Sequence, residues 1–241
     1  MSSFQAAAWS SVGKKLITGI TGLLLIGYLI VHLIGNLSLF VGPDAFNHYA
    51  HFLEGLLHGW FVIAFEIALI TVFLFHIISA STVALIDKFG ARPVSYKKRA
   101  DAGGPSKKSL PSRSMIITGA VLLVFVVWHV WTFKFGDPRM IPLEHGEEMK
   151  DLYSLVVASF KVEWITGAYL IAMILVGAHL WHGFWSAFQS LGWGNPRWTP
   201  LIQGVGIVFA LALAAGFFIL PLYAYFFVDP DSLNIAHAGG R

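Results

Sequence analysis

Five long apolar stretches separated by short polar segments form the hydrophobic pattern of this 241-residue chain. Each is long enough to cross about 30 Å of hydrocarbon, which takes about 20 helical residues at about 1.5 Å each. Helices satisfy every backbone polar group in lipid, and no period-two alternation suggests membrane strands. The predicted spans are residues 16–41, 59–86, 114–135, 162–188 and 202–227. We therefore predict an all-α polytopic membrane protein, with residues 1–241 forming a single five-helix domain.

The composition excludes a water-soluble domain and several kinds of chemistry. Apolar residues make up 56% of the chain and charged residues only 12%, with a mean hydropathy of +0.70. A soluble domain has about a quarter charged residues, which it needs to cover its surface in water. The chain has no cysteine, so it carries no disulfide, catalytic thiol or iron–sulfur ligand of its own.

The distribution of lysine and arginine predicts the orientation in the membrane. With the N-terminus inside, the inner segments hold eleven basic residues and the outer segments five. The positive-inside rule then places the N-terminus in the cytoplasm. The basic loop 88–113 is either a positive-inside signal that contacts anionic lipid or a docking surface for a cytoplasmic partner. Nothing in it indicates nucleic acid binding. The outer segment 43–57 is amphipathic, and we expect it to lie along the membrane interface.

Four of the five spans each carry a histidine: His32, His76, His129 and His179. A single histidine in a span is usually neutral and hydrogen-bonded to a neighbouring carbonyl group, but four together favour a function because ionisable groups are costly in lipid. At about 1.5 Å per residue, His32 and His129 both lie roughly 24 Å from the inner ends of their helices. His76 and His179 lie roughly 26 Å from the outer ends of theirs. The sequence thus predicts two histidine pairs at two depths.

Paired imidazoles that face each other across a helix bundle are the ligands that a six-coordinate haem iron needs. Because covalent c-type attachment requires cysteine, which is absent, the haem would be b-type. Two such haems, one above the other, would conduct electrons through the low-dielectric layer of the membrane.

Several motifs resemble those of a known family. They are Ser11-Val12-Gly13-Lys14-Lys15, the run Ile30–Leu37 around His32, the run Trp128–Gly136, and the run Ala178–Gln189. From about residue 10 to 228, the chain resembles the di-haem cytochrome b membrane anchor of succinate:quinone oxidoreductases and quinol:fumarate reductases, of the single-anchor, five-helix type.

The resemblance implies a subunit that binds a flavoprotein and an iron–sulfur protein on the cytoplasmic face. Electrons would pass through two haems b between succinate or fumarate, bound in another subunit, and membrane menaquinone or another quinone. His32 and His129 would hold the outer, distal haem, and His76 and His179 the inner, proximal haem. The direction of the physiological reaction and the oligomeric state of the complex are left open.

The resemblance also bears on His182, which lies on the same helix face as His179. In the family pattern the haem ligand precedes Gly183 by four positions, which selects His179. His182 is then a hydrogen-bond partner of a haem propionate or simply a histidine near the inner interface, and it remains the alternative ligand.

Quinone chemistry requires an ionisable group that exchanges protons, and Glu54 is the catalytic candidate. The family places a carboxylate in this region, although a solvated surface glutamate is the competing interpretation. Three nearby histidines could relay protons or simply lie at the interface: His48, His51 and His58. Glu66 lies inside a span, so it must be protonated, paired or facing a polar cavity.

Two other interpretations compete with this one. The chain could be a haem b, quinone-reactive subunit of another respiratory enzyme, such as a nitrate reductase or hydrogenase, although those families tend to place their ligands on other helices. It could also be a haem-free anchor or transporter that uses histidines to relay protons. Transporters favour broken helices, whereas Pro221 is the only proline in any predicted span.

Overall fold

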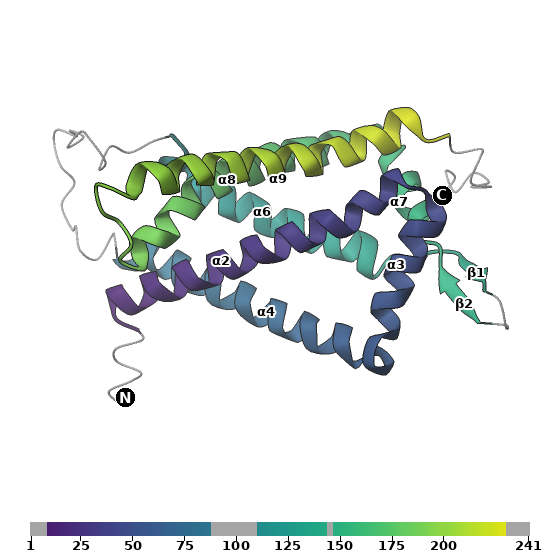
Figure 1. Cartoon of the computed structure of the whole chain (residues 1–241), viewed down its shortest axis with the longest axis horizontal. Coiled ribbons are helices and arrows are strands. Elements are labelled where there is room, and N and C mark those ends of the chain that lie inside the picture. The colour runs from purple at the N-terminus through teal and green to yellow at the C-terminus, as the bar shows by residue number, and fades with distance from the viewer. Residues whose placement is uncertain (1–8, 88–109, 144–146, 230–241) are drawn as a thin grey trace. The chain divides into compact units, whose positions relative to one another are not determined.

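All five predicted spans are helices in the computed structural model, which describes residues 9–87, 110–143 and 147–229 (Figure 1). Each is long and apolar enough to cross a membrane, which confirms the predicted helical, polytopic fold. The basic loop 88–113 falls almost wholly outside the described residues, so both interpretations of it stay predictions, as does the orientation. The long helices are α2 (Ser11–Asn36), α4 (Trp60–Ser81), α6 (Leu110–Lys134), α8 (Glu163–Ser190) and α9 (Thr199–Phe227).

Shorter elements join the long helices. The predicted amphipathic segment forms α3 (Pro43–Gly55), which begins with a proline at its first position and so loses no helical hydrogen bond there. The sequence pattern did not indicate the hairpin of β1 (Met140–Pro142) and β2 (Glu148–Lys150), in which Ile141 lies opposite Met149. The remaining elements are η1 (Leu37–Phe40), η2 (Leu56–Gly59), the π-helical η3 (Thr82–Asp87) and α7 (Leu152–Phe160).

A left-handed backbone turn separates α3 from α4. Leu57 and His58 have φ values of 52° and 55°, and Gly59 follows with φ of 86°. Such values interrupt the right-handed helix, and they are unusual for residues that carry a Cβ atom. The chain therefore changes direction between the two helices, and α3 runs at a steep angle to both α2 and α4 (Figure 1).

The described residues divide into two compact units, and each long helix contributes a part of its length to both. Unit 1 contains residues 9–28, 67–87, 110–120 and 177–211. Unit 2 contains residues 29–66, 121–143, 147–176 and 212–229. Since the boundaries cut through helices, the single-domain prediction is not tested by this division. The units are described separately below.

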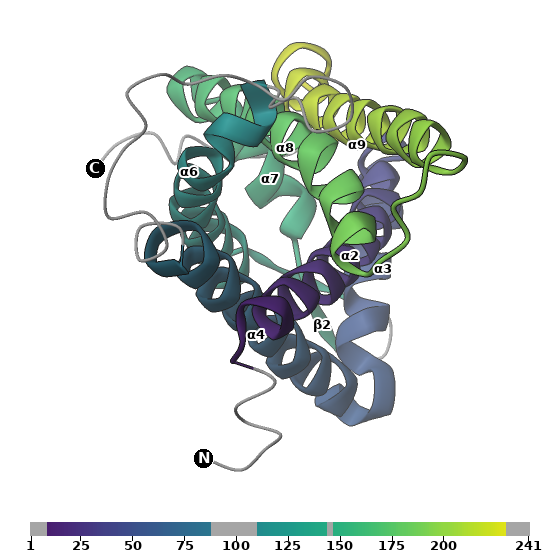
Figure 2. The same ribbon diagram turned by 90° about the vertical axis from the view of Figure 1, so that its left-hand side faces the viewer.

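In unit 1 the helices approach closely where side chains are small. Two of these helices, α2 and α4, come close together at the end of the molecule that faces the viewer in Figure 2. The hydroxyl of Thr18 on α2 donates a hydrogen bond to the fully buried Ser79 hydroxyl on α4, at 2.7 Å. A Cβ atom at Gly206 of α9 would lie only 2.8 Å from the Phe184 ring on α8. These contacts fit the general use of small and hydroxyl-bearing residues at helix interfaces in membranes.

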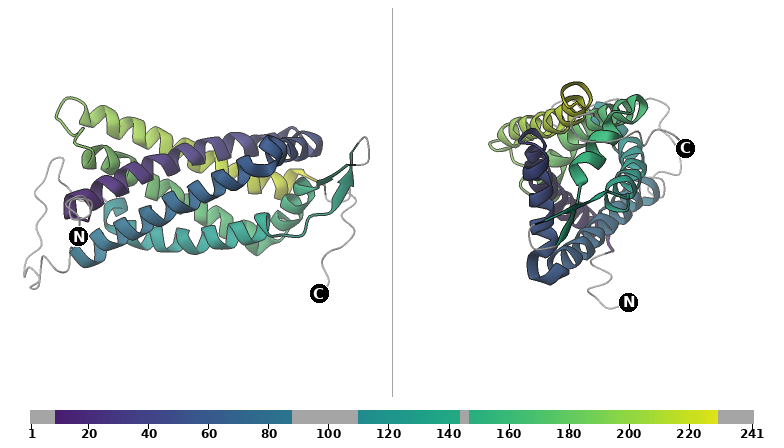
Figure 3. Two further views of the ribbon diagram at one scale, coloured as in Figure 1. Left: turned by 90° about the horizontal axis from the view of Figure 1, so that it is seen from below. Right: turned by 90° about the vertical axis from the view of Figure 1, so that its right-hand side faces the viewer.

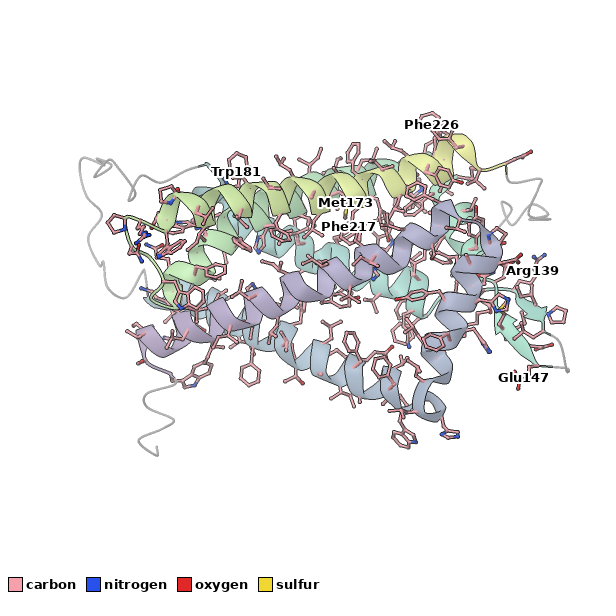
Figure 4. All side chains as sticks on the ribbon, in the orientation of Figure 1. Arg139, Glu147, Met173, Trp181, Phe217 and Phe226 are labelled. Carbon is pink, nitrogen blue, oxygen red and sulfur yellow. The ribbon has the colours of Figure 1, made fainter. Side chains whose placement is uncertain are left out.

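Unit 2 contains an apolar core. Its buried residues come from η1, α7, α8, α9 and the position after α9: Leu39, Tyr153, Val157, Phe160, Tyr169, Leu220, Ala224 and Val228. The β-hairpin and the short helix α7 follow one another at one end of this unit, with Arg139 and Glu147 on the hairpin (Figures 3 and 4). The aromatic members of the core also surround one of the predicted histidines.

A buried polar cluster fastens α3 to α7 in unit 2. The Asn47 amide donates to Asp151 Oδ1 at 3.0 Å, and its own oxygen accepts the backbone N–H of Tyr153 at 2.9 Å. Arg139 donates to Asp151 Oδ2 at 2.8 Å, and Asp151 caps α7 by accepting the Ser154 N–H. Burial alone would raise the pKa of Asp151, but the hydrogen bonds from Ser154, Asn47 and Arg139 hold it below its ordinary value.

Candidate functional site

The structure brings His32 of α2 and His129 of α6 together in unit 2. Their ring centroids are 5.8 Å apart and the two rings are nearly perpendicular, at 85°. Phe217, which points from α9 toward the interior, lies 5.7 Å from the His32 ring (Figure 4). Phe125 stacks on the His129 ring at 5.8 Å. Aromatic side chains therefore hold both imidazoles in place.

Polar groups also contact this first pair. The Tyr169 hydroxyl lies 3.1 Å from Nδ1 of His129, and the tyrosine is buried against Phe125 and Phe160. Beside His32, the Asn36 amide nitrogen lies 3.4 Å from Nδ1 but donates a shorter bond, 2.8 Å, to the His32 carbonyl oxygen.

The second pair, His76 of α4 and His179 of α8, lies in unit 1. Each imidazole contacts a threonine on another helix through its Nδ1 atom. Thr21 Oγ1 of α2 lies 3.2 Å from Nδ1 of His76, and Thr118 Oγ1 of α6 lies 3.1 Å from Nδ1 of His179.

The other hydrogen bonds of the two threonines are compatible with a proton on Nδ1 of each imidazole. Thr21 donates its hydroxyl proton to the Ile17 carbonyl oxygen at 2.6 Å, and Thr118 donates to carbonyl oxygens of its own helix at 3.1 Å. Each hydroxyl oxygen is then free to accept a proton from Nδ1. The neutral imidazole that donates from Nδ1 keeps a lone pair on Nε2, which is the form that ligates a metal.

Glycines bring the helix backbone close to this second pair. A Cβ atom at Gly22 would lie 3.3 Å from Cε1 of His76, and one at Gly119 would lie 3.5 Å from Cε1 of His179. Among the two neighbouring histidines of α8, His179 is therefore the one that contacts the Thr118-Gly119 pair. His182 is half-buried one turn further along the same helix.

The geometry of the first pair fits the ligands of a haem iron. Two imidazoles on opposite faces of one metal ion place their ring centroids about 6 Å apart, since each metal–nitrogen bond is about 2 Å long. The separation of His32 and His129, 5.8 Å, matches this value. No group of three or more histidine, cysteine or acidic side chains suited to a metal ion occurs among the described residues. Two protein ligands are sufficient where a porphyrin supplies the other four nitrogens.

The two glutamates singled out in the sequence are both ion-paired in unit 2. Glu54 on α3 accepts a hydrogen bond from Lys150 of β2 at 2.8 Å, and both side chains are more than 40% exposed. Glu66 on α4 pairs with Lys134 at the end of α6, which is one of the three states expected for it. Of the nearby histidines, His51 is half-buried, and His48 and His58 are exposed.

Three contact residues were missed by the sequence reasoning: Thr21, Thr118 and Tyr169. The signal that could have indicated them is a hydroxyl-bearing side chain inside an apolar span, one helix away from a predicted histidine. Threonine and tyrosine are common enough at ordinary helix interfaces that sequence spacing alone does not separate the two roles.

A comparison with known proteins supports the family resemblance. The chain is 27% identical over 192 residues to the succinate dehydrogenase cytochrome b558 subunit of Bacillus subtilis (strain 168), covering 78% of this chain and 83% of that protein. No family model matches the chain, and no solved structure matches it. The match confirms the predicted resemblance to succinate dehydrogenase cytochrome b subunits. Together with the five apolar helices, it makes the chain a multi-pass bacterial inner-membrane protein.

Proposed function

We propose that the chain is the cytochrome b membrane anchor of a succinate dehydrogenase or fumarate reductase, and that it conducts electrons between an iron–sulfur subunit and a membrane quinone. The observation that carries this proposal is the presence of one histidine pair in each compact unit, with the two members of a pair on different helices. The name of the bacterial relative, a succinate dehydrogenase cytochrome b558 subunit, supports haem b as the cofactor.

Each histidine pair would hold one haem b, which when bound supplies a one-electron carrier. His32 and His129 would ligate the first through rings that aromatic neighbours keep in position. His76 and His179 would ligate the second through Nε2, because their Nδ1 atoms face threonine hydroxyls. The contact of His179 with Thr118 favours it over His182, which would lie near a propionate instead.

The oxidation of succinate would take place in other subunits of the complex. A flavoprotein subunit would hold the dicarboxylate, and an iron–sulfur subunit would connect it to this chain. The basic loop 88–113 remains the candidate docking surface on the cytoplasmic side, by charge and predicted orientation alone.

Glu54 would exchange protons with the quinone. A reduced quinone carries two protons in addition to two electrons, so a carboxylate that exchanges with water is needed near the site of reaction. Glu54 is partly exposed, and its bond to Lys150 positions the carboxylate. We expect Glu54→Gln to slow quinone reduction while leaving the haem content unchanged, and Glu148→Gln on the neighbouring hairpin to leave both unchanged.

Haem content tests the main proposal. A pyridine haemochrome assay on the purified complex should give two haems b per copy of this chain. His32→Ala and His76→Ala should each remove one haem, whereas His51→Ala, outside both pairs, should remove none. A colourless complex would refute the proposal and favour the haem-free anchor. A haem lost in His182→Ala but kept in His179→Ala would reverse the assignment on α8.

A further inference from the structure

Two threonine–histidine contacts in unit 1 suggest a further role for the chain. We propose that Thr21 and Thr118 are positioning residues that lower the reduction potential of the haem held by His76 and His179. The inference rests on the proposed function, because it assumes that these two imidazoles are haem ligands. It concerns how the chain adjusts that haem rather than whether the haem binds.

The physical basis is the direction of the hydrogen bonds. An imidazole that ligates iron through Nε2 carries its proton on Nδ1, and each threonine can accept that proton because its own hydroxyl can donate to a carbonyl oxygen of its own helix. An imidazole that donates this proton becomes a stronger electron donor at Nε2. Stronger donation stabilises ferric over ferrous iron, which lowers the potential. Removing the acceptor should therefore raise it.

The glycine beside each threonine lets the imidazole reach the hydroxyl. A Cβ atom added at Gly22 would lie 3.3 Å from Cε1 of His76, and one added at Gly119 would lie 3.5 Å from Cε1 of His179. The same dipeptide, threonine then glycine, thus occurs on α2 and on α6 and contacts the corresponding edge of each ring. A repeated arrangement on two helices is better explained by a shared role than by packing at a single interface.

Both threonines should contribute to the potential of the same haem, because each lies beside Nδ1 of one of its two imidazoles.

The effect should be confined to one haem, because the other pair has different partners. Nδ1 of His129 faces the Tyr169 hydroxyl, and His32 lies beside the Asn36 amide. Neither of these side chains belongs to unit 1. A variant of Thr118 that changes only one of two potentials would thus also report which haem is bound by which pair.

The test is a redox titration of the purified complex, followed in the absorption bands of the two haems and in the electron paramagnetic resonance of the ferric forms. Thr118→Val removes the hydroxyl at nearly constant shape, and Thr118→Ser restores an acceptor. Thr21→Val is the second variant. Thr132→Val is the matched control, because Thr132 also lies on α6 and donates to a backbone carbonyl four residues earlier, that of Trp128, and among the described residues it makes no hydrogen bond to a histidine.

We expect Thr118→Val to raise one of the two midpoint potentials, so that the ratio of reduced to oxidised haem at a fixed applied potential increases several-fold. Thr21→Val should also raise the potential of the same haem, Thr118→Ser should restore the original value, and Thr132→Val should change neither potential. If Thr118→Val loses the haem while Thr118→Ser keeps it, the hydroxyl still has the positioning role.

Other outcomes overturn the inference. The inference is wrong if the Thr118→Val complex retains both haems and their potentials are unchanged or lowered. It is also wrong if the haem is lost in both Thr118→Val and Thr118→Ser. Failure of the proposed function looks different: the unaltered complex would then lack haem b, or would keep both haems after replacement of His76 and of His179.

Discussion

Replacement of Asn47 by alanine should loosen the attachment of α3 to α7. The Asn47 side chain is 1% exposed and makes two hydrogen bonds, to the Asp151 carboxylate and to the backbone N–H of Tyr153. In the alanine variant, the Tyr153 N–H loses its partner inside the protein. Asp151 keeps the hydrogen bonds from Arg139 and Ser154.

The magnitude follows from these two losses. A buried donor left without a partner costs about 1–3 kcal/mol, and the remaining loss at Asp151 is one bond of about 1 kcal/mol. We therefore expect Asn47→Ala to lower the free energy of unfolding by about 2–4 kcal/mol. For a chain of this size, this corresponds to a decrease of roughly 4–16 °C in Tm, at about 2–4 °C per kcal/mol.

The assay is thermal unfolding of the detergent-purified complex, followed by the fraction that remains monodisperse after heating. Glu148→Ala is the control, because Glu148 is exposed on the hairpin of the same unit and should change Tm very little. If Asn47→Ala has the same Tm as the Glu148→Ala control, the free-energy cost assigned to the unpaired N–H group is wrong.

The same cluster predicts a pH dependence. Hydrogen bonds from its neighbours lower the pKa of Asp151 in the folded state, so the unfolded chain binds more protons at this group. Its contribution to stability is therefore fully present above its unfolded pKa of about 3.9 and is lost as the pH falls through the lower folded value. The stability difference between the unaltered protein and Asp151→Asn should accordingly shrink with acidification below about pH 4. A difference that grows on acidification would contradict this sign.

Two more predictions follow from close contacts. Gly206→Ala should destabilise the protein by about 1–3 kcal/mol, because the new Cβ would lie 2.8 Å from the Phe184 ring. Gly204→Ala, on the same helix with no atom within 4 Å, should leave the melting temperature unchanged or raise it. Tyr169→Phe should raise the potential of the haem assigned to His129 without affecting the other haem, and a redox titration would check this.

Much of the fold could be read from local sequence features. An apolar segment long enough to cross the lipid satisfies its backbone hydrogen bonds by forming a helix. The five predicted spans therefore agree with the observed helices to within a few residues at most ends. The amphipathic pattern of residues 43–57 predicted α3 for a similar reason, since its apolar face repeats with the helical period. The hairpin was missed because strands of three residues carry too little alternation to be recognised.

The histidine pairs could be predicted from the sequence only in part. The depth of each histidine follows from helix rise alone, which is why the sequence could match His32 with His129. The rotation of each helix about its own axis does not follow from the rise, because it depends on packing against the other helices. The structure alone therefore decides that the rings of this pair face each other.

The sequence by itself determined the number of spans, the helical backbone and the depths of four imidazoles, because each depends only on the length and hydrophobicity of a continuous segment. Only the tertiary structure decided that Thr118 contacts His179 and not His182, that Lys134 pairs with Glu66, and which groups bury Asp151. Apart from the contacts of Arg139 and Ser154 with Asp151, these contacts join residues 61 or more positions apart in the chain. Such contacts are set by how side chains from different helices fit together, which no local pattern encodes.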